Sequence, residues 1–282
     1  MSDPTTIPYA APVDRLLTYG DARNLILQPD YLELGFEPEH IPELIRMATD
    51  AHLNWADSDS LEVWAPIHAW RTLGQLHAES ASEPLLSLFD ELVANEWIIE
   101  EMPDIYGQIG PAALPALAHY LAEPGHLLFS YVAASACLRE IGRQQPTVRA
   151  ECVSLITQRL EQFAANDPTL NGCLISDLID LKAVEAAPLM ARAFEASQID
   201  VSVAGDWEDV QVEMGLLAQR ETPSRNEWLE EVVDTARKRA DVLTAIEQPT
   251  TTSRNSHPPA AKKEKAKRKQ AEKSRKKNRK RK

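Results

Sequence analysis

Lysine and arginine dominate the last 25 residues of the chain. This stretch, PPAAKKEKAKRKQAEKSRKKNRKRK, holds ten Lys, four Arg and two Glu, a net charge of +12. Clustered cations displace counterions from a polyphosphate, which predicts salt-dependent contact with RNA, the ribosome, DNA or an acidic protein. No aromatic residue is interleaved with them, so stacking on unpaired bases is not expected. The predicted polyanion-binding side chains are Lys262, Lys263, Lys265, Lys267, Arg268, Lys269, Lys273, Arg275, Lys276, Lys277, Arg279, Lys280, Arg281 and Lys282.

The remainder of the chain has the opposite charge. The whole protein carries −13 at pH 7, so residues 1–257 carry −25. The basic segment therefore has two other interpretations, a loose association with this acidic body and a solvated tail without a binding role. The carboxylates of the body favour a basic protein partner.

A second charged motif, GDWEDVQVEMG at 205–215, gathers carboxylates around a tryptophan. A hard cation needs several oxygen ligands, but the stretch lacks the D-x-[DN]-x-[DN]-G pattern of a calcium loop. Three interpretations stay open: a packing corner anchored by the tryptophan, a partner-binding surface, and a metal site. The residues of this motif that we single out for partner binding are Asp206, Trp207, Glu208 and Asp209.

Catalytic chemistry has two weak candidates. Asp177 and Asp180 lie beside an apolar stripe, and Glu100 and Asp104 are four residues apart, so either pair could share a helix face for acid–base work. Acidic helices often contain such pairs, and neither has a histidine or a metal motif beside it. The histidine spacings fit no metal site, and the common nucleotide-binding and hydrolase motifs are absent from the sequence. We therefore predict no catalytic residue, no cofactor and no metal.

Thiol chemistry is not expected either, because each cysteine lies inside an apolar helical pattern, as a small buried residue does. The three are Cys137, Cys152 and Cys173. Four aromatic residues at helical spacing are likewise more typical of a core than of a groove. They are Trp64, Trp70, Trp97 and Tyr131.

The elements that must position these residues are helices. Apolar residues recur with the helical period from residue 38 to 196, and strand-like alternation is scarce. In the loop WADSDSLE at 55–62, Ser60 is expected to cap the next helix. Alternation at Val201 and Val203, followed by Gly205, breaks the helical rhythm. Four apolar stripes predict short helices, at 85–92, 114–121, 148–163 and 186–193.

The predicted helices form repeated pairs. The segments RTLGQL (71–76), DIYGQIG (104–110) and CLREIG (137–142) end alike, and Leu73, Tyr106 and Leu138 recur 33 and 32 residues apart. Three helices begin near a proline, where the missing N–H removes no helical hydrogen bond. These prolines are Pro84, Pro115 and Pro188. A period of this size predicts a stack of helical pairs.

This unit, a helix ending in Leu/Ile-Gly followed by a short turn and a Pro-initiated helix, resembles a HEAT-like repeat of the bacterial kind found in phycobilisome lyases. The phrases HIPELIRMATD, EVWAPIHAWRTLGQL and GDWEDVQVEMGLL also resemble an uncharacterised bacterial family of HEAT-like proteins that has no assigned activity. The resemblance implies an α-solenoid with a concave binding face. It also implies an alternative function, that of a bilin lyase or pigment-attachment chaperone.

We predict four segments. They are an N-terminal cap segment (1–37), a HEAT-like repeat solenoid (38–223), a terminal helix (224–248) and a disordered Lys/Arg-rich tail (249–282). Ser224 and Glu227 fit a capping box at the start of the terminal helix, and Trp228 is expected to dock that helix.

A cytoplasmic location is expected. The longest stretch without charge, Pro or Gly, 126–138, is shorter than the roughly 20 residues of a membrane span. The N-terminal residues also lack the basic and apolar regions of a secretory signal. We predict an all-α, non-enzymatic interaction scaffold that binds a protein partner through the Pro-started helices (83–94, 111–122 and 183–196), while the tail adds a polyanion contact.

Overall fold

The computed structural model describes residues 8–24 and 29–223, and every regular element in these ranges is helical. The predicted all-α class is thus confirmed for the described part of the chain, which contains no β-strand. The longer helices are α1 (Ile41–Ala48), α3 (Ala65–Gln75), α4 (Ser82–Glu91), α5 (Glu96–Ile109), α6 (Leu114–Ala122), α7 (Leu128–Gln144), α8 (Arg149–Leu160), α9 (Pro168–Asp180) and α10 (Ala187–Glu195). The shorter ones are α2 (Ala51–Asn54), α11 (Val201–Ala204) and α12 (Trp207–Glu213).

Short 3-10 turns directly precede six of these helices, and three more lie in the N-terminal segment. They are η1 (Val13–Thr18), η2 (Ala22–Asn24), η3 (Leu32–Leu34), η4 (Pro38–His40), η5 (Glu62–Trp64), η6 (Glu79–Ala81), η7 (Gly110–Ala113), η8 (Pro146–Val148) and η9 (Val184–Ala186). The predicted prolines lie in the first turns of their helices: Pro115 and Pro188 are the second residues of α6 and α10, and Pro84 is the third residue of α4. Their missing N–H groups therefore remove no helical hydrogen bond.

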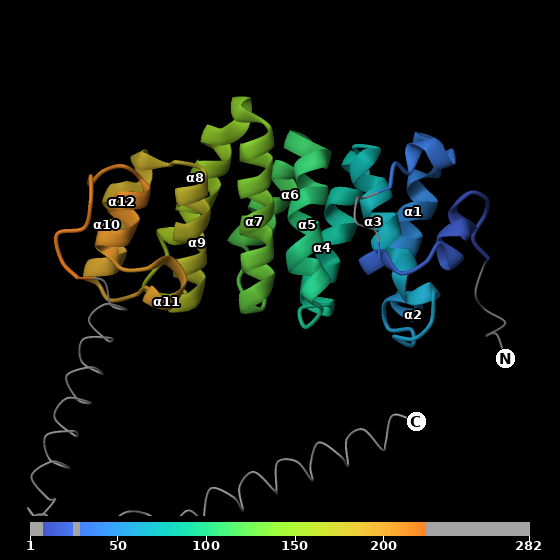
Figure 1. Ribbon diagram of the computed structural model, residues 1–282, viewed down its shortest axis with the longest axis horizontal. Coiled ribbons are helices and arrows are strands. Elements are labelled where there is room, and N and C mark those ends of the chain that lie inside the picture. Colours follow the sequence, from blue (N-terminus) through green and yellow to red (C-terminus); the bar gives the residue numbers. More distant parts are fainter. Residues whose placement is uncertain (1–7, 25–28, 224–282) are drawn as a thin grey trace, which may run out of the picture. The chain divides into compact units, whose positions relative to one another are not determined.

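The helices pack as two adjacent rows. In one row α1 contacts α3, α3 contacts α5, α5 contacts α7, and α7 contacts α9. In the other row α4 contacts α6 and α6 contacts α8, while each of these three helices also packs against α7. Figure 1 shows the helices following one another in chain order. Each helix therefore buries its apolar stripe against its neighbours in the sequence.

The turns that follow α3 and α9 have the same geometry. After α3, the N–H of Ala78 donates to the carbonyl of Leu73 (3.0 Å); after α9, the N–H of Ala183 donates to that of Leu178 (2.9 Å). The residues between, His77 and Lys182, are left-handed with φ of 48° and 54°. This bonding pattern ends a helix by satisfying its last carbonyls. The same turn also follows α10, where the N–H of Gln198 donates to the carbonyl of Ala193 (3.1 Å) and Ser197 has φ of 56°.

The Leu/Ile-Gly endings noted in the sequence mark close approaches between helices. A β-carbon on Gly74 would lie 3.0 Å from the Gln108 side chain of α5, and one on Gly142 would lie 2.9 Å from Leu181 Cδ2. A β-carbon on Gly107 would lie 2.5 Å from Gln144 of α7. Glycine therefore recurs because a side chain at this position would separate adjacent units.

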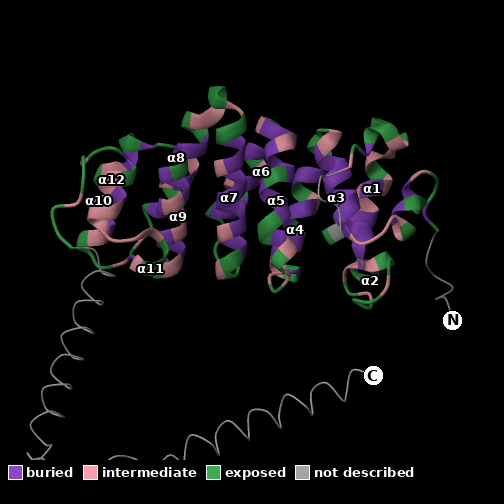
Figure 2. Ribbon diagram, viewed as in Figure 1, coloured by how far each residue is buried: buried purple, intermediate pink, exposed green. Residues whose placement is uncertain are grey.

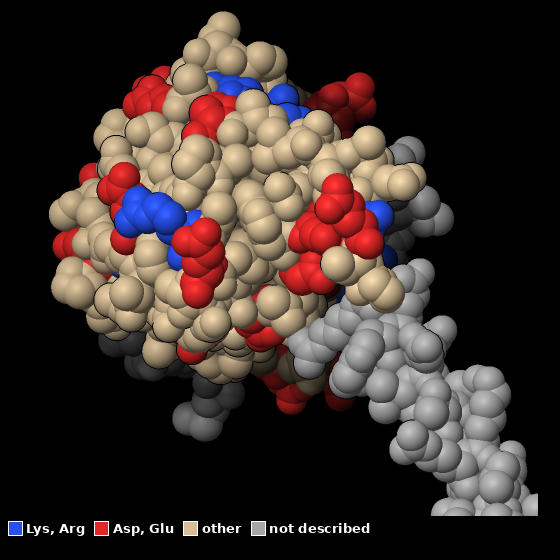
Figure 3. Space-filling model, turned by 90° about the vertical axis from the view of Figure 1, so that its left-hand side faces the viewer, with Lys and Arg blue, Asp and Glu red and all other residues tan. Residues whose placement is uncertain are grey.

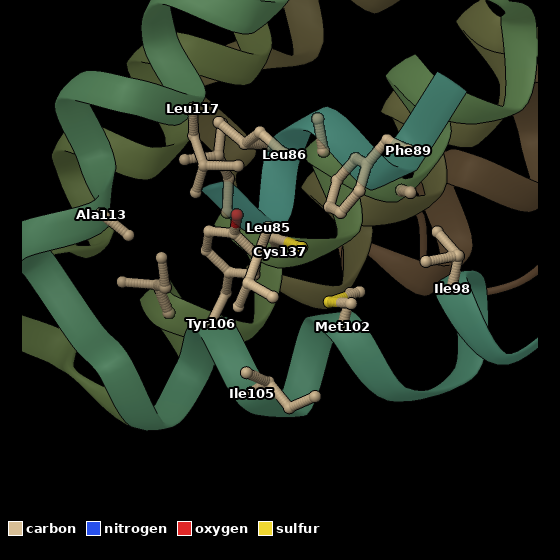
Figure 4. Packing of buried hydrophobic residues seen from close by; sticks show 14 of the residues in the cluster. Leu85, Leu86, Phe89, Ile98, Met102, Ile105, Tyr106, Ala113, Leu117 and Cys137 are labelled. Atoms are coloured by element: carbon tan, nitrogen blue, oxygen red, sulfur yellow. The ribbon is translucent and has the colours of Figure 1, made fainter. Parts of the chain in front are cut away.

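The core runs without interruption through both rows. Figure 4 shows Phe89 of α4, Tyr106 of α5 and Cys137 of α7 converging between the rows. Tyr106 is fully buried, and its hydroxyl donates to the carbonyl of Ser82 at 2.6 Å. Figure 2 shows buried residues along α3, α5 and α7. Of the four aromatic residues predicted to lie in the core, Trp64, Trp70 and Tyr131 are buried and Trp97 is half-buried.

The N-terminal segment packs against α3. The hydroxyl of Tyr31 lies 2.7 Å from His68 Nδ1, and Nε2 of the same ring lies 2.9 Å from the carbonyl oxygen of Gly20. The Gln75 amide donates to the carbonyl of Pro29 at 2.9 Å. These contacts leave α3 buried over almost its whole length, consistent with the predicted cap segment.

One local prediction is wrong. Ser60 caps no helix: its hydroxyl is buried with no hydrogen-bond partner in the described part of the chain, and η5 begins after Leu61 without a side-chain cap. The expected break in the helical rhythm is present, because α10 ends at Glu195 and Gly205 has a positive φ of 75°. Val201 and Val203 lie within α11, one helical turn that packs on α9 and that Asp200 caps by accepting from the N–H of Ser202.

Candidate functional site

The loop between α6 and α7, residues 123–127, is tied to the end of α4 by one carboxylate. Asp90 accepts hydrogen bonds from the imidazole Nδ1 of His126 (2.6 Å), from the N–H of Leu127 (3.0 Å) and from the hydroxyl of Tyr120 (3.1 Å). Burial alone would raise the pKa of Asp90, but these hydrogen bonds and one from Ser130 outweigh it and hold that pKa below its usual value. Asp90 is therefore ionised at neutral pH.

Aromatic rings complete this cluster. The ring of His126 stacks on that of Tyr120 with centroids 3.8 Å apart and meets Tyr131 edge-on at 5.4 Å. The Tyr131 hydroxyl donates to the carbonyl of Glu123 at 2.6 Å, and the guanidinium of Arg159 lies over the Tyr131 ring at 4.0 Å. The loop is thus held in one conformation by α4, α6, α7 and α8 together.

Two open cavities lie on either side of His126. One, of about 410 Å³, lies between α4 and α6; its lining includes Glu83, Leu86, Ala116 and Tyr120. The other, of about 350 Å³, lies between the loop, the end of α8 and the start of α9, and is lined by Arg159 among others. A smaller hollow of about 90 Å³ lies on the surface between α6 and α8. The row α4, α6, α8 therefore carries a series of depressions.

Two exposed apolar residues are close in the sequence to residues that line a cavity. Leu127 and Phe129 are 50% and 48% exposed, and they neighbour His126 and Leu128, which line the cavity beside α8. Scattered apolar residues are normal on a protein surface, but these two directly follow the ordered polar side chain of His126. This combination is typical of the centre and rim of a protein-binding surface.

The structure also brings the acidic motif at 205–215 together. Asp206 caps α12 through the N–H of Asp209, and the Arg220 guanidinium donates to the carboxylates of Asp206 (2.7 Å) and Asp209. Glu208 accepts from the hydroxyl of Thr222 at 2.7 Å. The Arg220 hydrogen bond lowers the pKa of Asp206, and the Thr222 hydrogen bond lowers that of Glu208.

Trp207 is half-buried and packs on Phe194 with ring centroids 5.6 Å apart. The carboxylates and Trp207 thus have intramolecular partners, which agrees with the interpretation as a packing corner; the partner-binding surface stays a prediction. Sequence reasoning missed Arg220, the cation that joins these carboxylates. In the end-on view of Figure 3, acidic side chains form separate groups and the basic side chains in view lie beside them.

The proposed acid–base pairs do not share a cavity. Asp177 is buried between α9 and α7, accepts from the Ser135 hydroxyl (2.5 Å) and pairs with Arg139 (3.1 Å). Burial raises the pKa of Asp177 to about 6. Asp180 is exposed and lies 3.7 Å from Arg139, so the arginine joins the two carboxylates as a structural contact between helices. Glu100 and Asp104 are both exposed on α5.

The cysteines have the environment predicted for core residues. Cys137 and Cys152 are buried and Cys173 is half-buried. Burial raises the pKa of Cys152 and that of Cys173 to about 11, so these thiols are protonated at neutral pH. The alternative function would need a groove faced by polar residues or by a thiol, and these thiols have the environment of core residues.

In residues 8–24 and 29–223, no group of three or more His, Cys, Asp or Glu is arranged to hold a metal ion. None of the helices described combines the length and apolar composition that a membrane crossing requires. The predicted polyanion-binding residues 262–282 and the capping box with Trp228 lie outside the described residues. The chain matches no family model, no curated protein and no solved structure.

Sequence reasoning also missed the cluster around His126. Asp90 and His126 are 36 residues apart, about one repeat, and meet only because α4 and the α6–α7 loop pack side by side. The one signal in the sequence is the loop EPGHLL, in which a histidine follows a Pro-Gly turn between two apolar helices.

Proposed function

We propose that this chain is a non-enzymatic interaction scaffold, an α-solenoid of HEAT-like helical pairs that binds a protein partner on the surface of α4, α6 and α8. The observation that carries the proposal is the series of depressions along this row, centred on the ordered cluster around His126. Interfaces of this kind combine a preformed hollow with apolar and aromatic anchors.

Two further features support the solenoid class. The turns after α3 and α9 repeat the same hydrogen bonds, and the glycines at the ends of α3, α5 and α7 permit the same close contact with the next unit. Repeated pairs that lean on their neighbours give an extended surface, and such surfaces commonly bind other proteins. The resemblance of the repeated segments to bacterial HEAT-like proteins points the same way.

The basic residues 262–282 add a second contact in this proposal, with RNA, DNA or another polyanion. A tethered cationic segment raises the local concentration of whatever it binds near the helical body, so two weak contacts act together. The binding is electrostatic and loses affinity linearly in log salt.

The test of the protein-binding surface compares two double variants, each of which replaces two exposed apolar residues by serine at a different place on the surface. Leu127→Ser/Phe129→Ser removes two exposed apolar side chains at the loop between α6 and α7, and Leu32→Ser/Leu61→Ser removes two side chains of similar exposure (43% and 52%) outside the predicted binding surfaces. Both variants are expected to unfold at the same denaturant concentration as the parent chain. Co-purification of a partner from the native host is expected to be lost in the first variant and kept in the second, whereas equal retention would place the surface elsewhere.

The test of the basic segment compares the full chain with residues 1–257. Titration against RNA and DNA over a range of salt is expected to show binding by the full chain alone, with log affinity falling linearly against log salt. Binding that is unchanged by salt, or that persists in residues 1–257, would contradict an electrostatic role for the tail.

A further inference from the structure

The depression between α4 and α6 lies in a part of the chain that is rich in carboxylates. Between Arg71 and Arg139 the sequence contains nine Asp and Glu and no Lys or Arg over 67 residues. This span covers α4, α5, α6 and the first two-thirds of α7. Of the nine carboxylates, Glu101 is paired with Arg71 at 2.5 Å, and Asp90 and Glu123 contact the imidazoles of His126 and His119. Glu83 and Glu123 are exposed, so the depression has an acidic margin.

His126 lies at the edge of this depression between two carboxylates. Its Nδ1 donates to Asp90 at 2.6 Å, and its Nε2 is buried, has no hydrogen-bond partner in the described residues and lies 3.6 Å from Glu123 Oε2. The other carboxylate oxygen of Glu123 lies 3.2 Å from His119 Nε2, in an exposed contact. A group that brings N–H donors and positive charge would bind the Glu123 carboxylate from the open side of the depression.

The shape of the depression fits a long basic side chain. Its volume of about 410 Å³ is at the lower end of ligand pockets. Leu86 and Ala116 offer apolar surface for an aliphatic stem, while Glu83 and Glu123 are exposed carboxylates at its margin. Glu83 makes no ion pair with any described residue. Lysine and arginine side chains bind in this way, with the stem on apolar surface and the charged head among oxygens.

We infer that the depression between α4 and α6 binds an arginine or lysine side chain from a basic segment of the partner protein. The inference rests on the proposed function and names the chemistry of the partner. The head of the side chain lies among the exposed carboxylates of Glu83 and Glu123 at the margin of the depression. Charge complementarity selects a basic segment over neutral or acidic ones.

The test uses a fluorescent oligoarginine peptide and an oligoglutamine peptide as probes, measured by fluorescence anisotropy. The full chain is titrated first, and the titration is repeated without residues 258–282 so that its own cations cannot compete. We expect binding of oligoarginine and none of oligoglutamine. Absence of oligoarginine binding in both forms overturns the inference but leaves the proposed function intact, since partner capture is measured separately.

Matched charge variants locate the site. Glu123→Gln keeps the shape of the side chain and removes its charge. Glu91→Gln removes one exposed charge of α4 outside the lining of the depression. Glu123→Gln is expected to keep the stability of the parent and to weaken oligoarginine binding about tenfold, an effect of roughly 1.4 kcal/mol. Glu91→Gln is expected to weaken it less than about twofold, as a general field effect. Equal loss in both variants would show attraction by net charge alone and would overturn the inference.

Discussion

Asp177 is expected to make the protein less stable as pH rises from about 4 to 7. It is a fully buried carboxyl between α9 and α7, and burial raises its pKa from 3.8 to about 6 in spite of the partners Ser135 and Arg139. In the unfolded chain the same group ionises near its ordinary pKa. Between pH 3.8 and about 6, the native state therefore keeps a proton on Asp177 that the unfolded state has already released.

The size of the effect follows from the shift. A rise of about two pKa units, at about 1.4 kcal/mol each, means that Asp177 contributes about 3 kcal/mol less to the free energy of unfolding at pH 7 than below pH 4. Asp177→Asn cannot ionise and keeps an oxygen that accepts from Ser135. As the pH rises from 4 to 7, the free energy of unfolding of the variant is therefore expected to increase by about 3 kcal/mol relative to that of the parent chain.

Urea denaturation at several pH values measures this difference, and subtracting the two proteins removes the titration of all other groups. Asp180→Asn is the matched control, because Asp180 lies on the same helix and is exposed. If the stability difference between the parent and Asp177→Asn were the same at pH 4 and pH 7, the reasoning from burial would be refuted.

Three further predictions concern the contacts between units, each measured by urea denaturation. Lys182 is left-handed, with φ of 54°, so Lys182→Gly is expected to raise the free energy of unfolding by about 0.5–1 kcal/mol; a decrease contradicts this. A β-carbon on Gly142 would lie 2.9 Å from Leu181, so Gly142→Ala is expected to lower the free energy of unfolding by about 1–2 kcal/mol in spite of its better helix propensity. A higher free energy of unfolding would show that Leu181 moves freely to make room. Glu101→Gln leaves the buried guanidinium of Arg71 without an ionised partner, so the free energy of unfolding is expected to fall by about 3 kcal/mol. An unchanged urea midpoint would contradict this.

Much of the local structure was predictable because it depends on near neighbours. The apolar stripes at helical spacing fixed which segments are helices, and Pro115 and Pro188 marked where two of them begin. The repeated Leu/Ile-Gly endings indicated a repeat before its geometry was known. Burial of Cys137 and Cys152 followed from their places in these stripes.

The candidate site depended on contacts between distant residues. The sequence places Asp90 and His126 on separate elements, and nothing in either segment indicates that one binds the other. Arg220 likewise joins Asp206 and Asp209 across more than ten residues, which composition and spacing do not reveal. Side-chain pairs of this kind form only once the helices have packed.

The sequence by itself determined the helical class and the opposite charges of residues 1–257 and 258–282, because periodicity and net charge are properties of the chain. Tertiary structure alone decided which carboxylates are neutralised and which face solvent. It paired Glu101 with Arg71 and Asp177 with Arg139, and it left Glu83 and Glu123 at the edge of an open depression. The physical reason is that electrostatic interactions depend on distance and burial in space, and neither is encoded in the spacing of residues along the chain.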